Sequence, residues 1–368
     1  MSGAPIPKGK RLRQLANPVI PLVMSADRLR IQRKTFCALS HAELAAWSRL
    51  LRDSTSTRWA FLSPVYAAAV HECIGTVEVL LCWRGDELAG VMLLQRARGW
   101  LGRMGLREPA GGQMSDYFGL LASPGVQLQW SVLLNAAGLH CLYFTHLDET
   151  QAAHGLVGQE CRIGLRTRIH PDGGAAHWEY LRTQDKKLVS DTERRERKLA
   201  AEHGALVFEM QTPTPQQDLD WLVNLKNAQY QRTGHDGGAL LDPANARLLQ
   251  RLLTSSDAYC QPRLSVLRSG GQMVAAHFGL QCGAVLHYWF PVYDQRFAVF
   301  SPGRILFRHI LAVSDLHGIA CIDRGEGDSA AKRDFANEEH VFCKGIVTAG
   351  LWGQALRGVQ SACWRLTA

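Results

Sequence analysis

The sequence predicts an α+β protein in two similar halves, each with a mixed, mostly antiparallel sheet flanked by helices. Three observations lead to this prediction. At 368 residues the chain is long for one domain and comfortable for two. Runs with strand periodicity alternate with segments of helical spacing, and the order of these segments in the first half recurs in the second. The turn at 83–90 also resembles the turn at 267–275, and each precedes an apolar strand.

The first half is expected to open with a strand at 29–36 and a helix at 41–51, whose apolar residues recur at helical spacing. Ser63 and Pro64 mark the start of a second helix, because Ser caps exposed backbone N–H groups and Pro suits the first helical position. A hairpin follows, with strands at 77–83 and 88–95 around a polar turn. The remaining expected elements are a helix at 130–138 and strands at 140–147 and 161–169.

The second half is expected to repeat this order. It contains a strand at 205–210, helices at 218–231 and 244–253, strands at 264–267, 272–281 and 285–293, a helix from 302 to 313 and a buried strand at 318–322. Asp242 is expected to cap the helix at 244–253. Between the halves, the densely charged segment 184–204 predicts a connecting helix. Such a helix is usually a solvated face with internal ion pairs, and the alternative is contact with an anion beside the second cleft.

Four residues open the helix that precedes the last expected strand: Ser301, Pro302, Gly303 and Arg304. Ser301 is expected to cap the helix, Pro302 occupies a position at which a missing N–H costs nothing, and Gly303 lets another group approach the backbone. The end of such a helix offers free amides and a positive dipole, which suit a phosphate. The alternative interpretation is a well-capped helix with no ligand.

The net charge of +8 is concentrated at the N-terminus. Residues 1–34 carry eight basic residues against Asp27 alone, a net charge of +7, and four prolines discourage regular structure at 1–28. We expect residues 1–28 to form a basic arm, either a solvated tail or a contact for nucleic acid, an anionic membrane face or an acidic partner. The rest of the chain is close to neutral, which argues against specific nucleic-acid binding as its main activity.

The cysteines and histidines indicate which cellular compartment and which cofactors to expect. The ten cysteines include no C-x-x-C pair and mostly lie in apolar runs, so we expect small buried side chains in a reducing compartment. The fourteen histidines show no metal-binding spacing, so no metal is expected. No apolar run has the length of a membrane span, and no secretory signal is evident. The expected location is cytoplasmic, with peripheral contact to the inner membrane as an extension.

Eight short segments, in this order, resemble those of one family. They are 61–66 (FLSPVY), 116–119 (DYFG), 190–195 (SDTERR), 229–234 (QYQRTG), 275–280 (AAHFGL), 287–294 (HYWFPVYD), 301–303 (SPG) and 323–325 (DRG). Together with the element order, they resemble the GNAT acyltransferases of the CelD/BcsL type, which are associated with bacterial cellulose and exopolysaccharide synthesis. The match runs from about residue 35 to residue 350. The chain is also similar to Fem-type peptidyltransferases, which carry two GNAT units.

The resemblance implies two tandem GNAT-like domains and a co-substrate. The domains are expected at 29–180 and 205–368, joined by the charged helix at 181–204, with the acyl-CoA cleft in the second. The family places the coenzyme A pyrophosphate at the start of the helix after the fourth strand, which corresponds to Ser301, Pro302, Gly303 and Arg304 here. Acetyl-CoA or another acyl-CoA is therefore the expected co-substrate, without a metal. Two departures are an incomplete Q/R-x-x-G-x-G/A loop and Ala331, where the family often has a tyrosine.

Acyl transfer to an amine needs a neutral amine, a polarised carbonyl and an acceptor for protons. His277 and His287 on neighbouring strands are the candidate bases, and Asp323 at a strand end is the candidate carboxylate. Each has a purely structural alternative, as a strand histidine or a helix-capping carboxylate. The candidate substrate-binding residues are Asp116, Tyr117, Tyr230, Arg232, Trp289, Glu326 and Lys332. The aromatic ones among them have a second interpretation as core side chains.

These features predict an N-acyltransferase that moves an acetyl or longer acyl group from coenzyme A to an amine or amino-sugar acceptor, in exopolysaccharide, cellulose or cell-envelope synthesis. Direct attack by the acceptor is expected, because no activated nucleophile is evident. The alternative is a non-catalytic GNAT-fold accessory or scaffold protein of an exopolysaccharide assembly, docked on the membrane or on a polysaccharide synthase by the basic arm. A third alternative, aminoacyl transfer from charged tRNA, is disfavoured by the near-neutral body.

Overall fold

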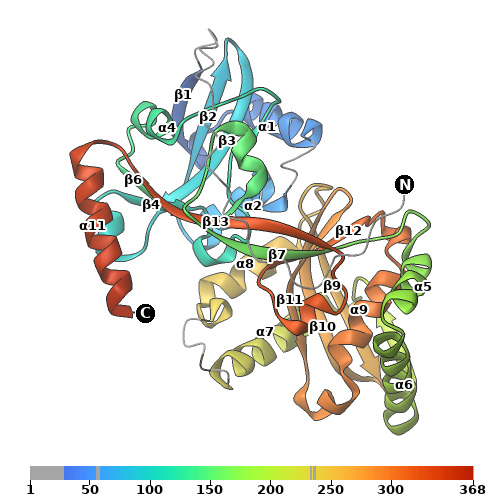
Figure 1. The fold of residues 1–368 in the computed structure, drawn as a ribbon. Coiled ribbons are helices and arrows are strands. Elements are labelled where there is room, and N and C mark those ends of the chain that lie inside the picture. Colours follow the sequence, from blue (N-terminus) through green and yellow to red (C-terminus); the bar gives the residue numbers. More distant parts are fainter. Residues whose placement is uncertain (1–28, 55–58, 233, 235–237, 368) are drawn as a thin grey trace.

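The computed structural model describes residues 29–54, 59–232, 234 and 238–367, and the predicted basic arm at 1–28 lies outside the described residues. The first half contains β1 (Arg30–Thr35), α1 (His41–Asp53), α2 (Pro64–Cys73), β2 (Val77–Arg84), β3 (Glu87–Arg96), α3 (Gly99–Arg103), β4 (Leu106–Pro109), β5 (Leu121–Ala122), α4 (Trp130–Ala136), β6 (Cys141–Asp148) and β7 (Glu160–Arg168). The second half contains α5 (Gly174–Gln184), α6 (Lys186–His203), β8 (Leu206–Glu209), α7 (Pro215–Arg232), α8 (Pro243–Leu253), β9 (Gln261–Ser269), β10 (Gln272–Cys282), β11 (Val285–Tyr293), α9 (Pro302–Ala312), β12 (Cys321–Glu326), α10 (Ala330–Arg333), β13 (Glu338–Thr348) and α11 (Gly350–Thr367). The predicted α+β class is confirmed (Figure 1).

The strands form one continuous sheet that repeats the same arrangement twice. Its order is β1-β2-β3-β4-β6-β13-β7-β12-β11-β10-β9-β8, with β5 paired to β3. In the first half, antiparallel strands lead to the parallel pair β4 and β6. In the second half, antiparallel strands lead to the parallel pair β11 and β12. Each half therefore contains one point at which two parallel neighbours meet within an otherwise antiparallel sheet.

The halves exchange strands at the centre of this sheet. The first half's β7 pairs with β12 of the second half, while β13, near the C-terminus, pairs with both β7 and the first half's β6. Figure 1 shows β7 and β13 side by side as a long ribbon that crosses from one half to the other. The division into domains at 29–180 and 205–368 stays a prediction, because this exchange makes the two halves share their central strands.

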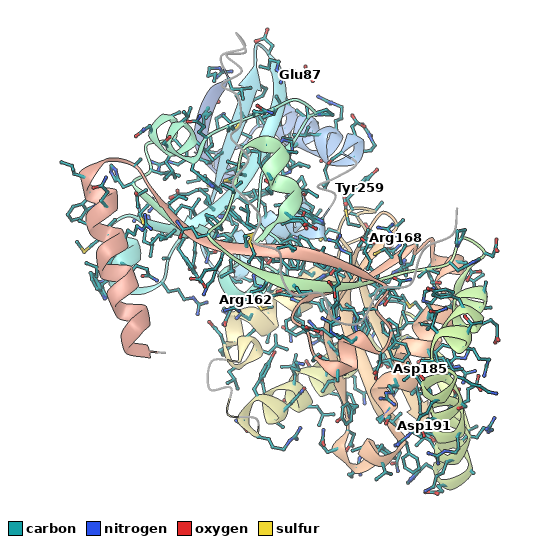
Figure 2. The ribbon with its side chains drawn as sticks, in the orientation of Figure 1. Glu87, Arg162, Arg168, Asp185, Asp191 and Tyr259 are labelled. Atoms are coloured by element: carbon teal, nitrogen blue, oxygen red, sulfur yellow. A yellow bond between two sulfur atoms is a disulfide. The ribbon has the colours of Figure 1, made fainter. Side chains whose placement is uncertain are left out.

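Ion pairs hold β7 against its neighbours at both ends. Arg168 pairs with Glu338 on β13, with Nη2 and Oε1 3.0 Å apart, and Arg162 pairs with Glu326 on β12 at 2.8 Å. Arg162 and Arg168 lie at opposite ends of β7 in Figure 2. Because the arginine of each pair is largely exposed, these ion pairs help to set the register in which β7 pairs with β12 and β13, and they add little to the stability of the fold.

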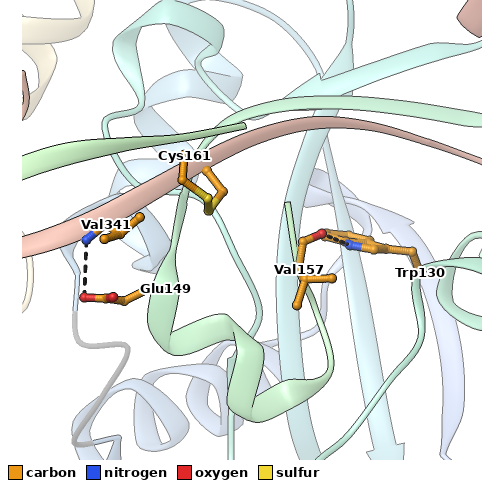
Figure 3. Close-up of a disulfide and its surroundings, with 6 residues drawn as sticks. Trp130, Glu149, Val157, Cys161 and Val341 are labelled. Carbon is orange, nitrogen blue, oxygen red and sulfur yellow. Dashed lines mark hydrogen bonds between the residues drawn. A yellow bond between two sulfur atoms is a disulfide. The ribbon is translucent and has the colours of Figure 1, made fainter. Parts of the chain in front are cut away.

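A disulfide between Cys161 and Cys343 joins β7 to β13 across a directly opposed pair (Figure 3). Beside it, Trp130 Nε1 donates to the carbonyl oxygen of Val157, and the backbone N–H of Val341 donates to Glu149. The prediction of reduced, buried cysteines is wrong for Cys161 and Cys343. Antiparallel neighbours placed opposite each other bring two Cα atoms to within 4.1 Å, and local sequence context does not reveal such a pairing.

The apolar residues that the sequence pattern predicts to be inside form three main cores. The largest is shared by both halves, because α1 and α2 of the first half pack with α7 and α8 of the second. A second core lies under α5, α6 and α9, and a third lies between α4 and the first half's strands. Ser63 and Asp242 cap α2 and α8 as predicted, accepting from the N–H groups of Tyr66 and Ala244. No helix in the described ranges has the length and apolar content that crossing a membrane requires.

Candidate functional site

The second half's parallel pair separates after three residue pairs. β11 and β12 are in register at Val285–Cys321, Leu286–Ile322 and His287–Asp323, and no further pair joins them. β11 continues for six residues to Tyr293, whereas β12 shifts its register against β7 after Asp323. Gly325 permits this bend, since its φ of 65° lies in the left-handed region that disfavours a side chain. The strands therefore part immediately beyond His287 and Asp323.

A cavity of about 410 Å³ lies at this separation. Its lining comes from β11, from the start of α9, from α7 and from the segment around α10, and includes Tyr288, Tyr293, Ser301, Gly303, Arg304, Phe307, Arg324, Lys226 and Lys332. Three of the four predicted cofactor-binding residues thus border it, and Pro302 is buried between them. The aromatic walls with a few cationic groups suit an elongated, partly apolar, anionic ligand.

The start of α9 faces the cavity, but Ser301 does not cap it. Ser301 has φ 53° and ψ 54°, and its side chain makes no capping hydrogen bond. The predicted cap is wrong because an N-cap serine needs an extended backbone to place its hydroxyl over the first amides. The Ser301 carbonyl oxygen instead accepts from the N–H of Arg304 at 2.9 Å. A Cβ on Gly303 would meet only Tyr293 Cδ1, at 3.8 Å, so the space beside the helix start is open.

Charged side chains surround the cavity mouth. Arg304 pairs with Asp334 at 2.8 Å and lies 3.7 Å from Asp191 on α6, whose position Figure 2 labels. Lys332 donates through Nζ to the carbonyl oxygen of Glu326 at 2.6 Å, and Lys226 donates to that of Pro291 at 3.2 Å. Burial lowers the pKa of Lys226 to about 8, and burial together with Arg324 lowers that of Lys332.

A cluster of ionisable side chains lies where β11 and β12 begin to separate. His287 Nε2 lies 2.8 Å from Asp116 Oδ2, and His287 Nδ1 lies 3.9 Å from Asp323 Oδ1. Asp116 comes from the loop before β5 in the first half, so the cluster needs both halves. Its carboxylate is the accessible member, with 26% of the side chain exposed against 6% for His287. Burial alone would raise the pKa of Asp116, but the hydrogen bond and charge of His287 hold it below its ordinary value.

Asp323 is fixed from the other side by a buried network. The Tyr117 hydroxyl donates to Asp323, and Arg166 donates to Asp323 Oδ2 at 2.9 Å and to the Tyr117 hydroxyl at 2.8 Å. The backbone N–H of Gly325 donates to Asp323 Oδ1 at 2.8 Å. Burial opposes ionisation, yet Arg166, His287, His340 and Tyr117 lower the pKa of Asp323 to about 2. The carboxylate therefore stays charged while it is almost fully buried.

The structure brings together Asp116, Tyr117, His287 and Asp323, and it brings together Ser301, Gly303, Arg304 and Lys332 at the adjoining cavity. It places His277 elsewhere. That ring is fully buried and stacks on Tyr288 at 4.1 Å, and burial lowers its pKa to about 3. Its side chain belongs to the layer behind the cavity wall.

The other predicted substrate-binding residues lie outside the two groups. Trp289 packs against Phe61 and Phe290 in the shared core. Tyr230 packs against Lys226, and Arg232 is exposed at the last position of α7. The carboxylate of Glu326 is paired with Arg162 and lies 3.2 Å from His146, although its backbone carbonyl contacts Lys332.

Sequence reasoning missed Arg166, His146 and Lys226. The available signal for Arg166 was the recurrence of arginine at alternate positions, 166 and 168, in the apolar run 161–169. For His146 the signal appears only in three dimensions, as a non-glycine residue with φ 54°. Lys226 lies in an ordinary helix, so nothing local sets it apart.

Comparison with known proteins agrees with this geometry. Residues 186–333 match the family described as acetyltransferase (GNAT) domain. No curated protein matches the chain. Among solved structures, FemX superposes with a TM-score of 0.54 at 11% identity, over 89% of this chain and 99% of FemX. The C-terminal DUF2156 domain of an Agrobacterium fabrum protein named as a lysylphosphatidylglycerol synthetase gives 0.50 at 12% identity, over 88% of this chain and 96% of that domain. The fold is GNAT-like.

Proposed function

We propose that this protein transfers an acyl group from acyl-CoA to the nitrogen of an amine or amino-sugar acceptor, because residues 186–333 match the family described as acetyltransferase (GNAT) domain. We also propose that this acceptor takes part in exopolysaccharide, cellulose or cell-envelope synthesis. The observation that carries the proposal is the cavity at the separation of β11 and β12, bordered by the start of α9, with the His287 cluster at the last paired residues of these strands.

The residues around the cavity fit a coenzyme A thioester. The start of α9 supplies a positive dipole for the pyrophosphate, and Gly303 leaves open space beside it. Arg304 and Arg324 add positive charge, while Tyr288 and Phe307 offer apolar walls to the pantetheine arm. The bound thioester supplies the electrophilic carbonyl.

The ionisable cluster supports direct attack by the acceptor. Asp116 is the exposed carboxylate and would bind the acceptor ammonium group. His287 accepts the proton that the ammonium group releases, through its 2.8 Å contact with Asp116, which leaves a neutral amine to attack the carbonyl. Asp323, held by Arg166 and Tyr117, places a negative charge 3.9 Å from the opposite side of the imidazole. The amine nitrogen forms the new C–N bond, and coenzyme A leaves as the thiol.

The second candidate function is a non-catalytic GNAT-fold accessory of an exopolysaccharide assembly, docked by the basic arm on a membrane or a synthase. One observation favours it: Ala331 stands at a cavity-lining position where the family often has a tyrosine. A protein of this kind would need no acyl-CoA, so the two candidates differ in a measurable property.

The test is a thiol-release assay. Purified protein is incubated with acetyl-CoA or longer acyl-CoAs and a panel of amines and amino sugars, and free coenzyme A is followed colorimetrically. The proposal predicts acceptor-dependent thiol release with stoichiometric acylated product in the mass spectrum. Tight acyl-CoA binding without turnover on any amine would favour a carrier or regulatory role, and the absence of binding would favour the accessory protein.

A further inference from the structure

Helix α11 carries an apolar stripe on the side that faces away from the protein. Leu351, Ala355 and Val359 recur every four residues, and all three are exposed, with Leu351 at 85% and Val359 at 39%. The opposite side packs inward through Leu356, which is 2% exposed, and through Gly353, where a Cβ would lie 2.0 Å from a backbone oxygen. The helix is thus attached by one side only, at the edge of the molecule (Figure 1).

The neighbouring helix α3 extends this apolar surface. Trp100 and Met104 are 52% and 39% exposed, and Trp352, 47% exposed, donates through Nε1 to the carbonyl oxygen of Met104 at 3.0 Å. We call the exposed side chains of Trp100, Met104, Leu351, Trp352 and Val359 the α3–α11 surface. It holds five of the twelve exposed large hydrophobic side chains of the described residues, so these are clustered and not scattered.

The two segments that form this surface carry charges of one sign. Residues 96–107 and 345–368 contain no aspartate or glutamate. Arg103 and Arg357 are exposed on α3 and α11, and within the described part of the chain no ion pair joins either of them to a carboxylate. An apolar stripe with tryptophans and arginines and without carboxylates is the composition of helices that lie in the interface of an anionic bilayer.

We propose that the α3–α11 surface binds the headgroup region of an anionic lipid bilayer, with α11 lying in the plane of the interface. Leu351, Val359, Trp100 and Trp352 enter the boundary between headgroups and acyl chains, while Arg103 and Arg357 contact lipid phosphates. The surface is separate from the basic arm at 1–28 and from the cavity between β11 and β12. The inference therefore stands whether or not the protein transfers acyl groups.

The bilayer fits this surface better than a protein partner does. An acidic protein would require a patterned set of cationic contacts, whereas the α3–α11 surface is a mainly apolar stripe flanked by Arg103 and Arg357. A second copy of the chain would bring Arg103 and Arg357 near their own equivalents, with no carboxylate in either segment to balance them. Anionic lipids instead present a continuous layer of phosphates over an apolar interior, which matches both features at once.

The test is co-sedimentation of the full chain with vesicles of phosphatidylcholine, alone or mixed with an equal amount of phosphatidylglycerol. We expect binding to the anionic vesicles that weakens with salt. Leu351→Ser/Val359→Ser lowers the partition coefficient by at least about tenfold, because two exposed apolar side chains no longer enter the interface. Arg103→Gln/Arg357→Gln lowers binding to the anionic vesicles only.

The matched control is Leu316→Ser/Val207→Ser, which makes the same two replacements at exposed positions on other surfaces. It should bind as the wild type does, and the basic arm is present in every variant, so its contribution cancels. Equal binding by wild type and Leu351→Ser/Val359→Ser would overturn the proposal. So would a dimer in light scattering that this variant dissociates while vesicles bind neither protein, since the surface would then join two copies.

Discussion

Asp116 and His287 lie 2.8 Å apart although 171 positions separate them in the chain. Asp116 belongs to a loop of the first half and His287 to a central strand of the second, so neither half alone contains the pair. The first half therefore does more than support the second, because it places the one partly exposed carboxylate of the cluster beside the last paired residues of β11 and β12.

We expect His287→Gln to lower kcat by at least about 100-fold while leaving acyl-CoA affinity unchanged, because the base contributes to proton transfer only. Asp116→Asn should lower kcat less and raise the acceptor KM, since it removes the group that binds the ammonium. The double variant should lose little more than His287→Gln, because the two residues act as a unit. His41→Gln, at an exposed histidine at the start of α1, is the control. If His287→Gln lowered the affinity for acyl-CoA as much as it lowers kcat, the assignment of His287 as the base would be contradicted.

Arg166→Met should destabilise the fold by about 3–5 kcal/mol, because it leaves the carboxylate of Asp323 buried without its cationic partner. The double variant Arg166→Met/Asp323→Leu removes both charges and should recover most of this loss. Urea denaturation of the three proteins measures the difference. If the double variant is as unstable as the sum of the two single variants, the pair is not the source of the effect.

The stability of the protein should depend on Asp323 at acid pH. Its pKa in the folded state is about 2, below the ordinary value of 3.8, so ionised Asp323 stabilises the native state above about pH 4. This contribution, about 2 kcal/mol, is lost as the pH falls from about 4 to about 2. The difference in unfolding free energy between wild type and Asp323→Asn should shrink across this window. Asp86→Asn replaces an exposed hairpin aspartate, and the difference in unfolding free energy between wild type and this variant should stay constant over the same pH range.

Reducing the Cys161–Cys343 disulfide should lower stability by about 2–4 kcal/mol, since the bond closes a loop of 182 residues. Cys343→Ser should show the same loss, and Cys37→Ser, at an exposed free cysteine, should show none. Mass spectrometry of a non-reduced digest checks the bond directly, through linked peptides that contain both residues. Complete alkylation of both thiols without a reductant would refute it.

Local pattern was sufficient for the elements around the site. Alternating apolar residues and glycine turns predicted both hairpins, which appear as β2–β3 and β9–β10. The Ser-Pro-Gly sequence at 301–303 predicted where α9 begins. The strand predicted at 318–322 occurs instead at Cys321–Glu326, because Ile319 is buried in a turn after the left-handed Gly318. Burial and strand structure leave the same apolar signal in the sequence.

Long-range pairing was beyond local pattern. Nothing in 161–169 shows that β7 leaves its own half to pair with β12, and no element was predicted for β13 or α11. Asp116, Tyr117, His287 and Asp323 were each singled out by residue type, but their mutual contacts depend on this strand exchange. The left-handed Ser301 and the buried Arg166 likewise follow from tertiary packing, which the sequence of neighbours does not encode.

Calorimetric titration with acetyl-CoA and longer acyl-CoAs tests the central claim most directly, on wild type, Gly303→Ala and Gly303→Trp. A Cβ at Gly303 has room, so the alanine variant should bind as the wild type does, in the micromolar range, about −8 kcal/mol. The indole of the tryptophan variant should fill the space beside the start of α9 and abolish binding. If all three proteins bound acyl-CoA, the ligand would have to bind away from the start of α9. If none bound it, the acyltransferase account would be contradicted.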